Sequence, residues 1–242
     1  MQKIDPADLI PFDIFENEPI KVDVVYADAN HPRNIFVTAI YQPKTRLWAH
    51  KDLATITLLM ARTLNKKHGY IVEVKDCLRT TDAQSAMQET DIVKAHPEWM
   101  EEPMMLSPPG GGGHPRAMAI DVCLLDKGGK EVDMGTPFDD MDKKSYRSCT
   151  DLTDEQMHNR TLLETTFVDC AKQLGFNLLP IPSEWWDFRF YPEYTQMFEP
   201  ISDNDLPKQM QQTKRFDNNI IDFDQSHFEN LKQKIIQQIE KF

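Results

Sequence analysis

The chain has 242 residues, of which 40% are hydrophobic and 27% charged, so it can enclose one large hydrophobic core or two small ones. Its formal net charge of −12 at pH 7 repels polyanions, which argues against nucleic acids and anionic membrane surfaces as partners. No apolar run approaches the roughly 18 residues that cross a bilayer, and the first residues lack a signal-peptide core, so we expect a folded cytoplasmic protein.

The first third of the chain alternates between strand and helix patterns. Residues 20–26 and 35–41 have the alternating apolar side chains that predict strands. Apolar residues at helical spacing then predict a helix over residues 50–68, which Gly69 ends. This helix leads into residues 70–75, whose β-branched side chains predict another strand of a sheet.

The middle of the chain contains a long irregular connection followed by a buried strand. Asp82 is a suitable cap for a helix that runs to about Ala95, where a His-Pro pair ends it. The loop after this helix is long, and long loops in compact domains are often functional. Residues 118–125 then predict a buried strand, and a turn with two glycines predicts a hairpin that returns over residues 131–134.

A capping box predicts a long helix in the last third of the chain. Thr153 is followed three residues later by Gln156, and Gly175 supplies the C-terminal stop. Two prolines then favour an extended conformation over residues 176–182. This extended segment leads directly into an acidic and aromatic cluster, Glu184-Trp-Trp-Asp187.

The C-terminal part differs in composition from the rest, so we divide the chain into a domain over residues 1–200 and a polar extension over residues 201–242. Near its end five apolar residues form one stripe at helical spacing: Phe228, Leu231, Ile235, Ile239 and Phe242. Such an amphipathic helix either docks on the parent domain or joins two copies of the chain in a homo-oligomer.

The most unusual segment is residues 110–121, where four glycines precede His114 and an aspartate, Asp121, interrupts a buried strand. An unpaired charge at such a position is costly, so something must compensate it. A metal ion held jointly with His114 would do so, and the downstream Glu184 and Asp187 could complete the site. The alternative is a structural pair between Asp121 and a nearby Arg or Lys.

Several separated motifs, taken together, resemble the D-alanyl-D-alanine dipeptidases of the VanX type in order and spacing. They are His114-Pro-Arg-Ala-Met-Ala-Ile-Asp121, Met134-Gly-Thr-Pro-Phe-Asp139-Asp-Met-Asp142, Glu184-Trp-Trp, and the strand end Asp76-Cys-Leu-Arg79. The similarity spans roughly residues 20 to 195. It implies the α+β fold of these metallopeptidases, also called hedgehog/VanX-like, with a central, mainly antiparallel sheet flanked by helices that carries a zinc ion.

The resemblance also implies the chemistry of the site. His114 and Asp121 match two zinc ligands, and their donor atoms suit this ion. Glu184 matches the general base, which takes a proton from a water molecule that the metal activates. Arg79 matches the residue that stabilises the oxyanion formed at the substrate carbonyl, a role that suits a permanently charged guanidinium.

Two more residues carry the substrate preference that the resemblance implies. Asp139 matches the carboxylate that pairs with the free ammonium group of a small dipeptide, and Tyr26 corresponds to a tyrosine that lines the pocket. The implied activity is therefore zinc-dependent hydrolysis of D-alanyl-D-alanine or a close relative. Small dipeptides, rather than nucleic acids or membranes, are the expected partners.

This chain departs from the family pattern at the third ligand position, where Asp187 replaces a histidine. A carboxylate can ligate zinc, but the more anionic site also tolerates other divalent ions. Alternatively another histidine, His158 or His96, supplies the ligand, or the metal is lost. Glycines replace the hydroxyl residue before His114. Two further functions therefore stay open: a related metal-dependent peptidase for longer wall peptides, and a catalytically silent binding protein of the same fold.

Overall fold

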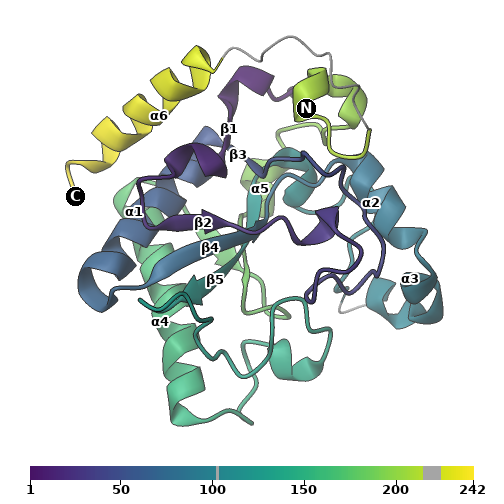
Figure 1. Ribbon diagram of the computed structural model, residues 1–242, viewed down its shortest axis with the longest axis horizontal. Helices are drawn as coiled ribbons and strands as arrows, with labels where there is room; N and C mark the ends of the chain where they lie inside the picture. Colours follow the sequence, from purple (N-terminus) through teal and green to yellow (C-terminus); the bar gives the residue numbers. More distant parts are fainter. Residues whose placement is uncertain (102–103, 215–224) are drawn as a thin grey trace.

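A five-stranded sheet forms the centre of the computed structural model, which describes residues 1–101, 104–214 and 225–242 (Figure 1). The strand order is β2 (Ile20–Val22), β4 (Ile71–Asp76), β5 (Ala119–Leu125), β7 (Asp187–Phe190) and β6 (Leu178–Pro180). Strand β2 runs parallel to β4, and the other neighbouring pairs are antiparallel. This confirms the expected α+β fold with a mainly antiparallel central sheet.

Two long helices pack against each other and against this sheet. They are α1 (Lys51–His68), which contacts β4, and α4 (Asp154–Gln173), which contacts β6. The residues of helix α1 from Leu53 to Ala61 are all buried, because the helix also contacts a small sheet of β1 (Leu9–Pro11) and β3 (Trp48–His50). The shorter helices α2 (Thr81–Gln88) and α3 (Asp91–Ala95) lie away from α1 and α4 (Figure 1).

The remaining elements are short, apart from the C-terminal helix. Helix α5 (Pro192–Thr195) follows β7, and α6 (Ser226–Ile239) closes the chain. The described residues also form 3-10 helices at Pro6–Asp8, Phe12–Phe15, Val25–Ala27, Pro97–Met100, His114–Arg116, Lys143–Ser145, Asp203–Asp205 and Lys208–Met210. No helix within the described ranges has both the length and the apolar character that crossing a membrane requires.

The strongest sequence signals are confirmed. Helix α1 ends at Gly69, whose φ of +74° is the left-handed conformation that glycine adopts without strain. Helix α4 begins with the predicted capping box, in which Thr153 and Gln156 exchange hydrogen bonds. Strands β4 and β5 match their predicted ranges to within one residue at each end.

Other predictions of local structure are wrong. Local hydrogen bonds explain the difference for residues 35–41 and, as described in the next paragraph, for the helix predicted from Asp82 to Ala95. Residues 35–41 form an irregular loop because Asn34 binds the backbone around it and Val37 adopts a φ of +50°. The predicted strand over residues 20–26 ends at Val22, so Tyr26 lies on a 3-10 helix. The return strand of the predicted hairpin shrinks to a single bridge between Leu125 and Glu131.

The helix predicted from Asp82 to Ala95 is two helices, α2 and α3. Thr80, rather than Asp82, caps the first of them, and Thr90 caps the second, because each threonine hydroxyl accepts a hydrogen bond from a backbone N–H three residues later. Helix α3 ends at Ala95, in agreement with the predicted stop before Pro97.

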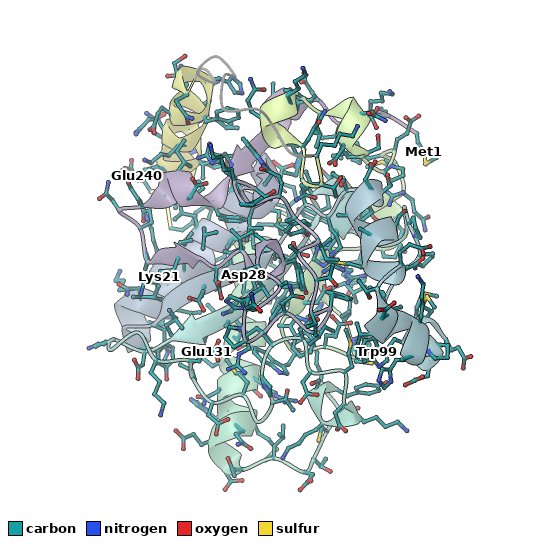
Figure 2. The ribbon with its side chains drawn as sticks, turned by 45° about the vertical axis from the view of Figure 1, so that its right-hand side comes forward. Met1, Lys21, Asp28, Trp99, Glu131 and Glu240 are labelled. Atoms are coloured by element: carbon teal, nitrogen blue, oxygen red, sulfur yellow. The ribbon has the colours of Figure 1, made fainter. Side chains whose placement is uncertain are left out.

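The C-terminal helix α6 packs on its own chain. Its buried residues Phe228, Ile235 and Ile239 face α1, β1 and the 3-10 helix at Phe12–Phe15. In Figure 1 it lies beside the N-terminal segment, and in Figure 2 Glu240 lies at the periphery of the molecule, as Met1 and Trp99 do. Most of the apolar face of the predicted amphipathic helix is thus covered within the chain, although Phe242 is exposed, and a homo-oligomer through this helix stays a prediction.

Candidate metal centre and active site

Three aspartates form a row across the central sheet. Asp121 of β5 lies opposite Asp76 of β4 on one side and opposite Asp187 of β7 on the other. All three are buried, with exposed fractions of 0% for Asp76, 2% for Asp121 and 1% for Asp187. Because like charges on directly opposite residues repel, and because burial removes their hydration, this row requires positive charge nearby.

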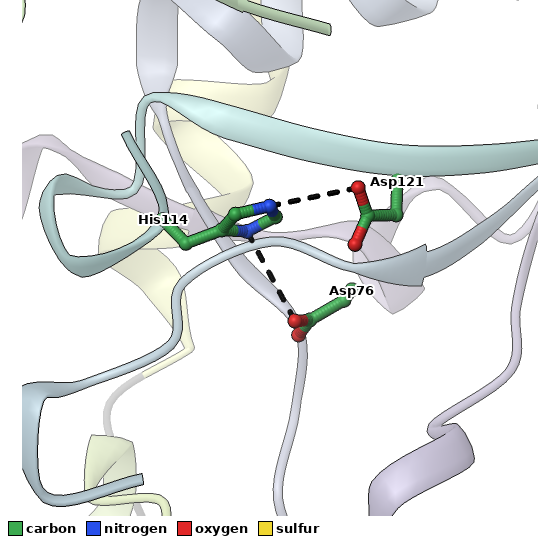
Figure 3. Close-up of side chains that lie close together, drawn as sticks. All are labelled: Asp76, His114 and Asp121. Atoms are coloured by element: carbon green, nitrogen blue, oxygen red, sulfur yellow. Dashed lines mark ion pairs between the residues drawn. The ribbon is translucent and has the colours of Figure 1, made fainter. Parts of the chain in front are cut away.

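The glycine-rich loop brings His114 to this row. Nδ1 of His114 donates a hydrogen bond to the carbonyl oxygen of Cys77 at 2.6 Å, which leaves Nε2 facing the carboxylates. Nε2 lies 3.5 Å from Oδ1 of Asp121 and 3.3 Å from Oδ2 of Asp187. Figure 3 shows the ring between Asp121 and Asp76. A backbone carbonyl that fixes the tautomer in this way is the usual partner of a metal-ligating histidine.

The electrostatics of this cluster favour a bound cation. Burial, the largest single effect, lowers the pKa of His114, but the carboxylates of Asp121 and Asp187 together raise it to about 10. Burial raises the pKa of Asp121. Oδ1 of Asp121 is buried and has no hydrogen-bond partner among residues 1–101, 104–214 and 225–242. A buried carboxylate oxygen that has no hydrogen bond and lies 3.5 Å from an imidazole nitrogen therefore fits a divalent metal ion.

Two overlapping groups of donor atoms could hold such an ion. Donor atoms of Asp76, His114 and Asp121 lie within 4.8 Å of one another, and so do those of Asp121, Glu184 and Asp187. Asp121 belongs to both groups, so it is the central ligand candidate. The predicted ligands His114, Asp121 and Asp187 do not form one of these groups, but they lie close together, since Nε2 of His114 is 3.5 Å from Asp121 and 3.3 Å from Asp187.

Arg79 lies beside the candidate metal centre. Its guanidinium is anchored by Asp76, with Nη2 2.6 Å from Oδ2, and the same nitrogen is 3.5 Å from Oδ2 of Asp121. The guanidinium carbon lies 5.7 Å from the centre of the Tyr26 ring. Its backbone N–H donates to the carbonyl oxygen of His114 at 3.1 Å. Arg79 therefore presents a fixed positive charge to the space next to the metal ligands.

Glu184 lies in the connection between β6 and β7. Burial raises the pKa of its carboxyl group well above the usual value, and the charges of Asp187 and Asp121 raise it further. Trp185 and Trp186 beside it are buried and exclude water, which strengthens electrostatic interactions at this carboxyl group. Such a group can accept a proton during a reaction and give it back.

Asp139 and Tyr26 form a hydrogen-bonded pair at the same cavity. The Tyr26 hydroxyl donates to Oδ2 of Asp139 at 2.8 Å. Burial raises the pKa of Asp139 to about 7. All seven residues that the sequence singles out line one cavity: Tyr26, Arg79, His114, Asp121, Asp139, Glu184 and Asp187.

The sequence analysis missed Arg189, which holds the residue at the unusual ligand position. Its Nε donates to Oδ1 of Asp187 at 2.9 Å, and its Nη2 contacts Oδ2. This guanidinium and His114 hold the pKa of Asp187 below the usual range, although burial acts in the opposite direction. The signal was available, because residues two apart on a strand share a face. Asp187 therefore contacts both Arg189 and the imidazole of His114.

The alternative histidines do not reach the centre. His96 pairs with Glu98 at 2.8 Å and stacks on Trp99, and His158 is exposed on α4. Among the described residues, neither histidine belongs to the groups of possible metal ligands, whose members besides His114 and Asp121 are Asp76, Glu184 and Asp187. Two other partners of the site, Asp76 and Tyr41, had no assigned role, and the Tyr41 hydroxyl donates to Asp76 at 2.7 Å.

Comparisons with known proteins find a matching family and similar proteins. The Peptidase M15 family, described as D-ala-D-ala dipeptidase, matches residues 15–203. The D-alanyl-D-alanine dipeptidase of Escherichia coli (strain K12) is 29% identical over 169 residues, which cover 70% of this chain and 78% of that protein. Among solved structures, the L-Ala D-Glu endopeptidase ChiX of Serratia marcescens aligns with a TM-score of 0.36 and 13% identity, over 60% of this chain and 83% of that chain.

Proposed function

Because this chain belongs to the Peptidase M15 family of D-alanyl-D-alanine dipeptidases and is a metallopeptidase, we propose that it hydrolyses D-alanyl-D-alanine or a closely related dipeptide. One observation carries the proposal. A single cavity holds His114, Asp121 and Asp187 next to Glu184 and Arg79, and one oxygen of Asp121 has no hydrogen-bond partner within the described ranges.

M15 peptidases depend on a metal, and the residues present fit one. We propose zinc, held by Nε2 of His114 and by one carboxylate oxygen each from Asp121 and Asp187. When bound, the ion would supply Lewis-acid chemistry, polarising the scissile carbonyl and making a water molecule more acidic. The two carboxylates also make the centre tolerant of other divalent ions.

Proton transfer is the proposed role of Glu184. Its carboxylate takes a proton from the attacking water and delivers it to the nitrogen of the leaving amino acid. Burial raises the pKa of Glu184, and a cation bound nearby would lower it again, which favours the carboxylate form that takes up the proton. Trp185 and Trp186 keep bulk water away from this exchange.

Charge stabilisation at the carbonyl oxygen is the proposed role of Arg79. Asp76 fixes the guanidinium, so that it need not reorganise when negative charge develops on that oxygen. At the Tyr26 end of the cavity, Asp139 binds the ammonium group of the substrate. A bound ammonium ion would keep Asp139 ionised despite its pKa of about 7, and it would restrict the enzyme to substrates with a free amine.

The test is hydrolysis of D-alanyl-D-alanine by purified protein with added Zn²⁺, compared with N-acetyl-D-alanyl-D-alanine and with longer wall peptides. We expect release of D-alanine from the free dipeptide and none from the blocked one, because Asp139 requires an ammonium group. The Glu184→Gln variant should lose turnover, by a factor of about 10² or more, while it keeps its metal.

Other outcomes would overturn the proposal. A preference for blocked or longer peptides would identify a related peptidase of different specificity. Stoichiometric metal without turnover of any dipeptide would identify a catalytically silent protein. Loss of metal together with activity in Glu184→Gln would make Glu184 a ligand rather than the base.

A further inference from the structure

Gln212 lies outside the part of the chain that matches the family, which ends at residue 203, yet it is completely buried against the catalytic centre. Its side-chain amide contacts the backbone on both sides of Arg79. Oε1 accepts a hydrogen bond from the backbone N–H of Thr80 at 2.8 Å, and Nε2 donates to the carbonyl oxygen of Leu78.

These two hydrogen bonds hold the two peptide groups that flank the α-carbon of Arg79. The peptide group before Arg79 is held at both ends, because its N–H also donates to the carbonyl oxygen of His114 at 3.1 Å. The backbone of Arg79 is therefore fixed between Gln212 on one side and the loop of a metal-ligand candidate on the other. Each residue has two soft backbone dihedral angles. Fixing the peptide groups on both sides of Arg79 therefore fixes the position and direction of its Cα–Cβ bond.

Gln212 is itself rigidly held. Its backbone N–H donates to Oδ1 of Asp203 at 2.9 Å, and Asp203 is completely buried. Its carbonyl oxygen accepts from the N–H of Gln42 at 2.7 Å and from Oγ1 of Thr45 at 3.1 Å. Because these contacts hold Gln212 in place, Gln212 can in turn restrain the backbone segment that it binds.

We infer that Gln212 is a positioning residue for Arg79, supplied by the polar segment that follows the family-matched region. A primary amide is the suitable side chain, since it offers one donor and one acceptor in a plane and so pairs with a carbonyl and an N–H at once. Without it, a buried N–H and a buried carbonyl would lose their partners. Arg79 would then sample other positions, and its charge would be misplaced when the oxyanion forms.

The inference rests on the proposed role of Arg79, so the first test uses turnover of D-alanyl-D-alanine by the full-length, metal-loaded protein. Gln212→Met keeps the size of the side chain and removes both hydrogen bonds. We expect kcat to fall by about 10- to 100-fold, KM to change by less than about threefold, and metal content to stay at the parent level. Gln211→Met is the matched control, because Gln211 reaches only the carbonyl oxygen of Leu206.

A double-mutant cycle separates positioning from general stabilisation. In an Arg79→Met background the substitution of Gln212 should cause little further loss, because there is no guanidinium left to position. An equal loss of kcat in both backgrounds would overturn the inference, and so would a parent-like kcat in the single variant. Should Gln212→Met fail to fold, Gln212→Asn, whose shorter side chain cannot span both peptide groups, replaces it in the same cycle.

Amide hydrogen exchange tests the contact without any activity. In the Gln212 variant the amide of Thr80 should exchange about tenfold faster or more, whereas the Gln211 control should match the parent. Unchanged exchange at Thr80 would show that Gln212 does not hold the backbone of Arg79 in solution. If the parent protein does not hydrolyse the dipeptide, the proposed function fails, while this measurement still decides whether Gln212 holds the Arg79 backbone.

Discussion

At the scale of single residues, the three aspartates of the sheet differ in how their charges are compensated. Asp76 pairs with Arg79, and Asp187 pairs with Arg189. Asp121 has two longer contacts, each of 3.5 Å, with Arg79 and with Nε2 of His114, and its Oδ1 has no hydrogen-bond partner within the described ranges. The charge that remains to be neutralised is therefore centred on Asp121, beside the imidazole of His114, which is why we place the metal there.

Asp139 should make the stability of the metal-free protein depend on pH. Its pKa is raised from 3.8 to about 7 by burial, so the folded state favours the protonated form. Stability therefore falls as pH rises from about 4 to about 7, and the cost persists at higher pH. The full cost is on the order of 4 kcal/mol. Asp139→Asn removes this ionisation, so its melting temperature should exceed that of the parent at pH 8.

The comparison at lower pH is the control for this prediction. Below about pH 4 this residue is largely protonated in both the folded and the unfolded state, so the two proteins should melt at similar temperatures. Thermal unfolding in the presence of a chelator measures both values. An equal difference in melting temperature at pH 5 and at pH 8 would contradict the assigned ionisation of Asp139.

At the scale of elements, the sequence predicts those parts of the fold that local signals determine. Helix α4 follows from its capping box, and β5 follows from its apolar run. The irregular loop over residues 35–41 does not follow, because side-chain hydrogen bonds of Asn34 override its strand-like pattern.

The residues of the candidate site are likewise of two kinds: some are predicted by local motifs, and others depend on contacts between distant segments. The motifs identify His114, Asp121 and Glu184, because each stands in a recognisable local pattern. The pairing of Asp121 with Asp76 and with Asp187 depends on strand register between distant segments, which no single segment encodes. The contact of Gln212 with the Arg79 backbone is equally remote in sequence.

The turn that delivers His114 leaves no room for a side chain at Gly113. A Cβ there would lie 3.0 Å from the Cβ of Ala119 and 3.1 Å from the carbonyl oxygen of Met118. These atoms belong to the start of β5 and cannot move cheaply. Gly113→Ala should therefore cost about 1–3 kcal/mol of unfolding free energy and weaken metal binding, because His114 shifts with the turn.

Gly128→Ala provides the comparison for this prediction. A Cβ at Gly128 would approach only the side chain of Asp126, in an exposed turn. Metal titration followed by fluorescence or calorimetry, together with denaturant unfolding, measures both variants. If Gly113→Ala bound metal as tightly as Gly128→Ala, the close packing of the His114 turn would not control the site.

At the scale of the whole molecule, both ends of the chain pack around the catalytic sheet. Gln2 forms a bridge with Phe198, and the segment that follows Phe198 binds α2 and the His114 turn through the backbone of Ile201. Helix α6 covers α1 and the N-terminal segment. Stability of the catalytic core therefore depends on residues distant from it in sequence.

Docking of α6 should contribute to global stability. Phe228 is 4% exposed, and its ring lies 5.3 Å from that of Trp48. Phe228→Ala should lower the free energy of unfolding by about 3 kcal/mol, because it removes a buried aromatic side chain. Phe242→Ala, at a position that is 58% exposed, should change it by less than about 0.5 kcal/mol. Equal unfolding midpoints in urea for the two variants would mean that α6 is not docked in solution.

The central claim is that Asp187, at a position where the family has a histidine, completes a metal centre with His114 and Asp121. A crystal structure of the metal-loaded protein, with the ion identified by anomalous scattering, tests it most directly. We predict an ion with one oxygen of Asp187, one oxygen of Asp121 and Nε2 of His114 each within about 2.0–2.2 Å. An ion that leaves Asp187 paired with Arg189 alone, or no ion at this place, would contradict the account.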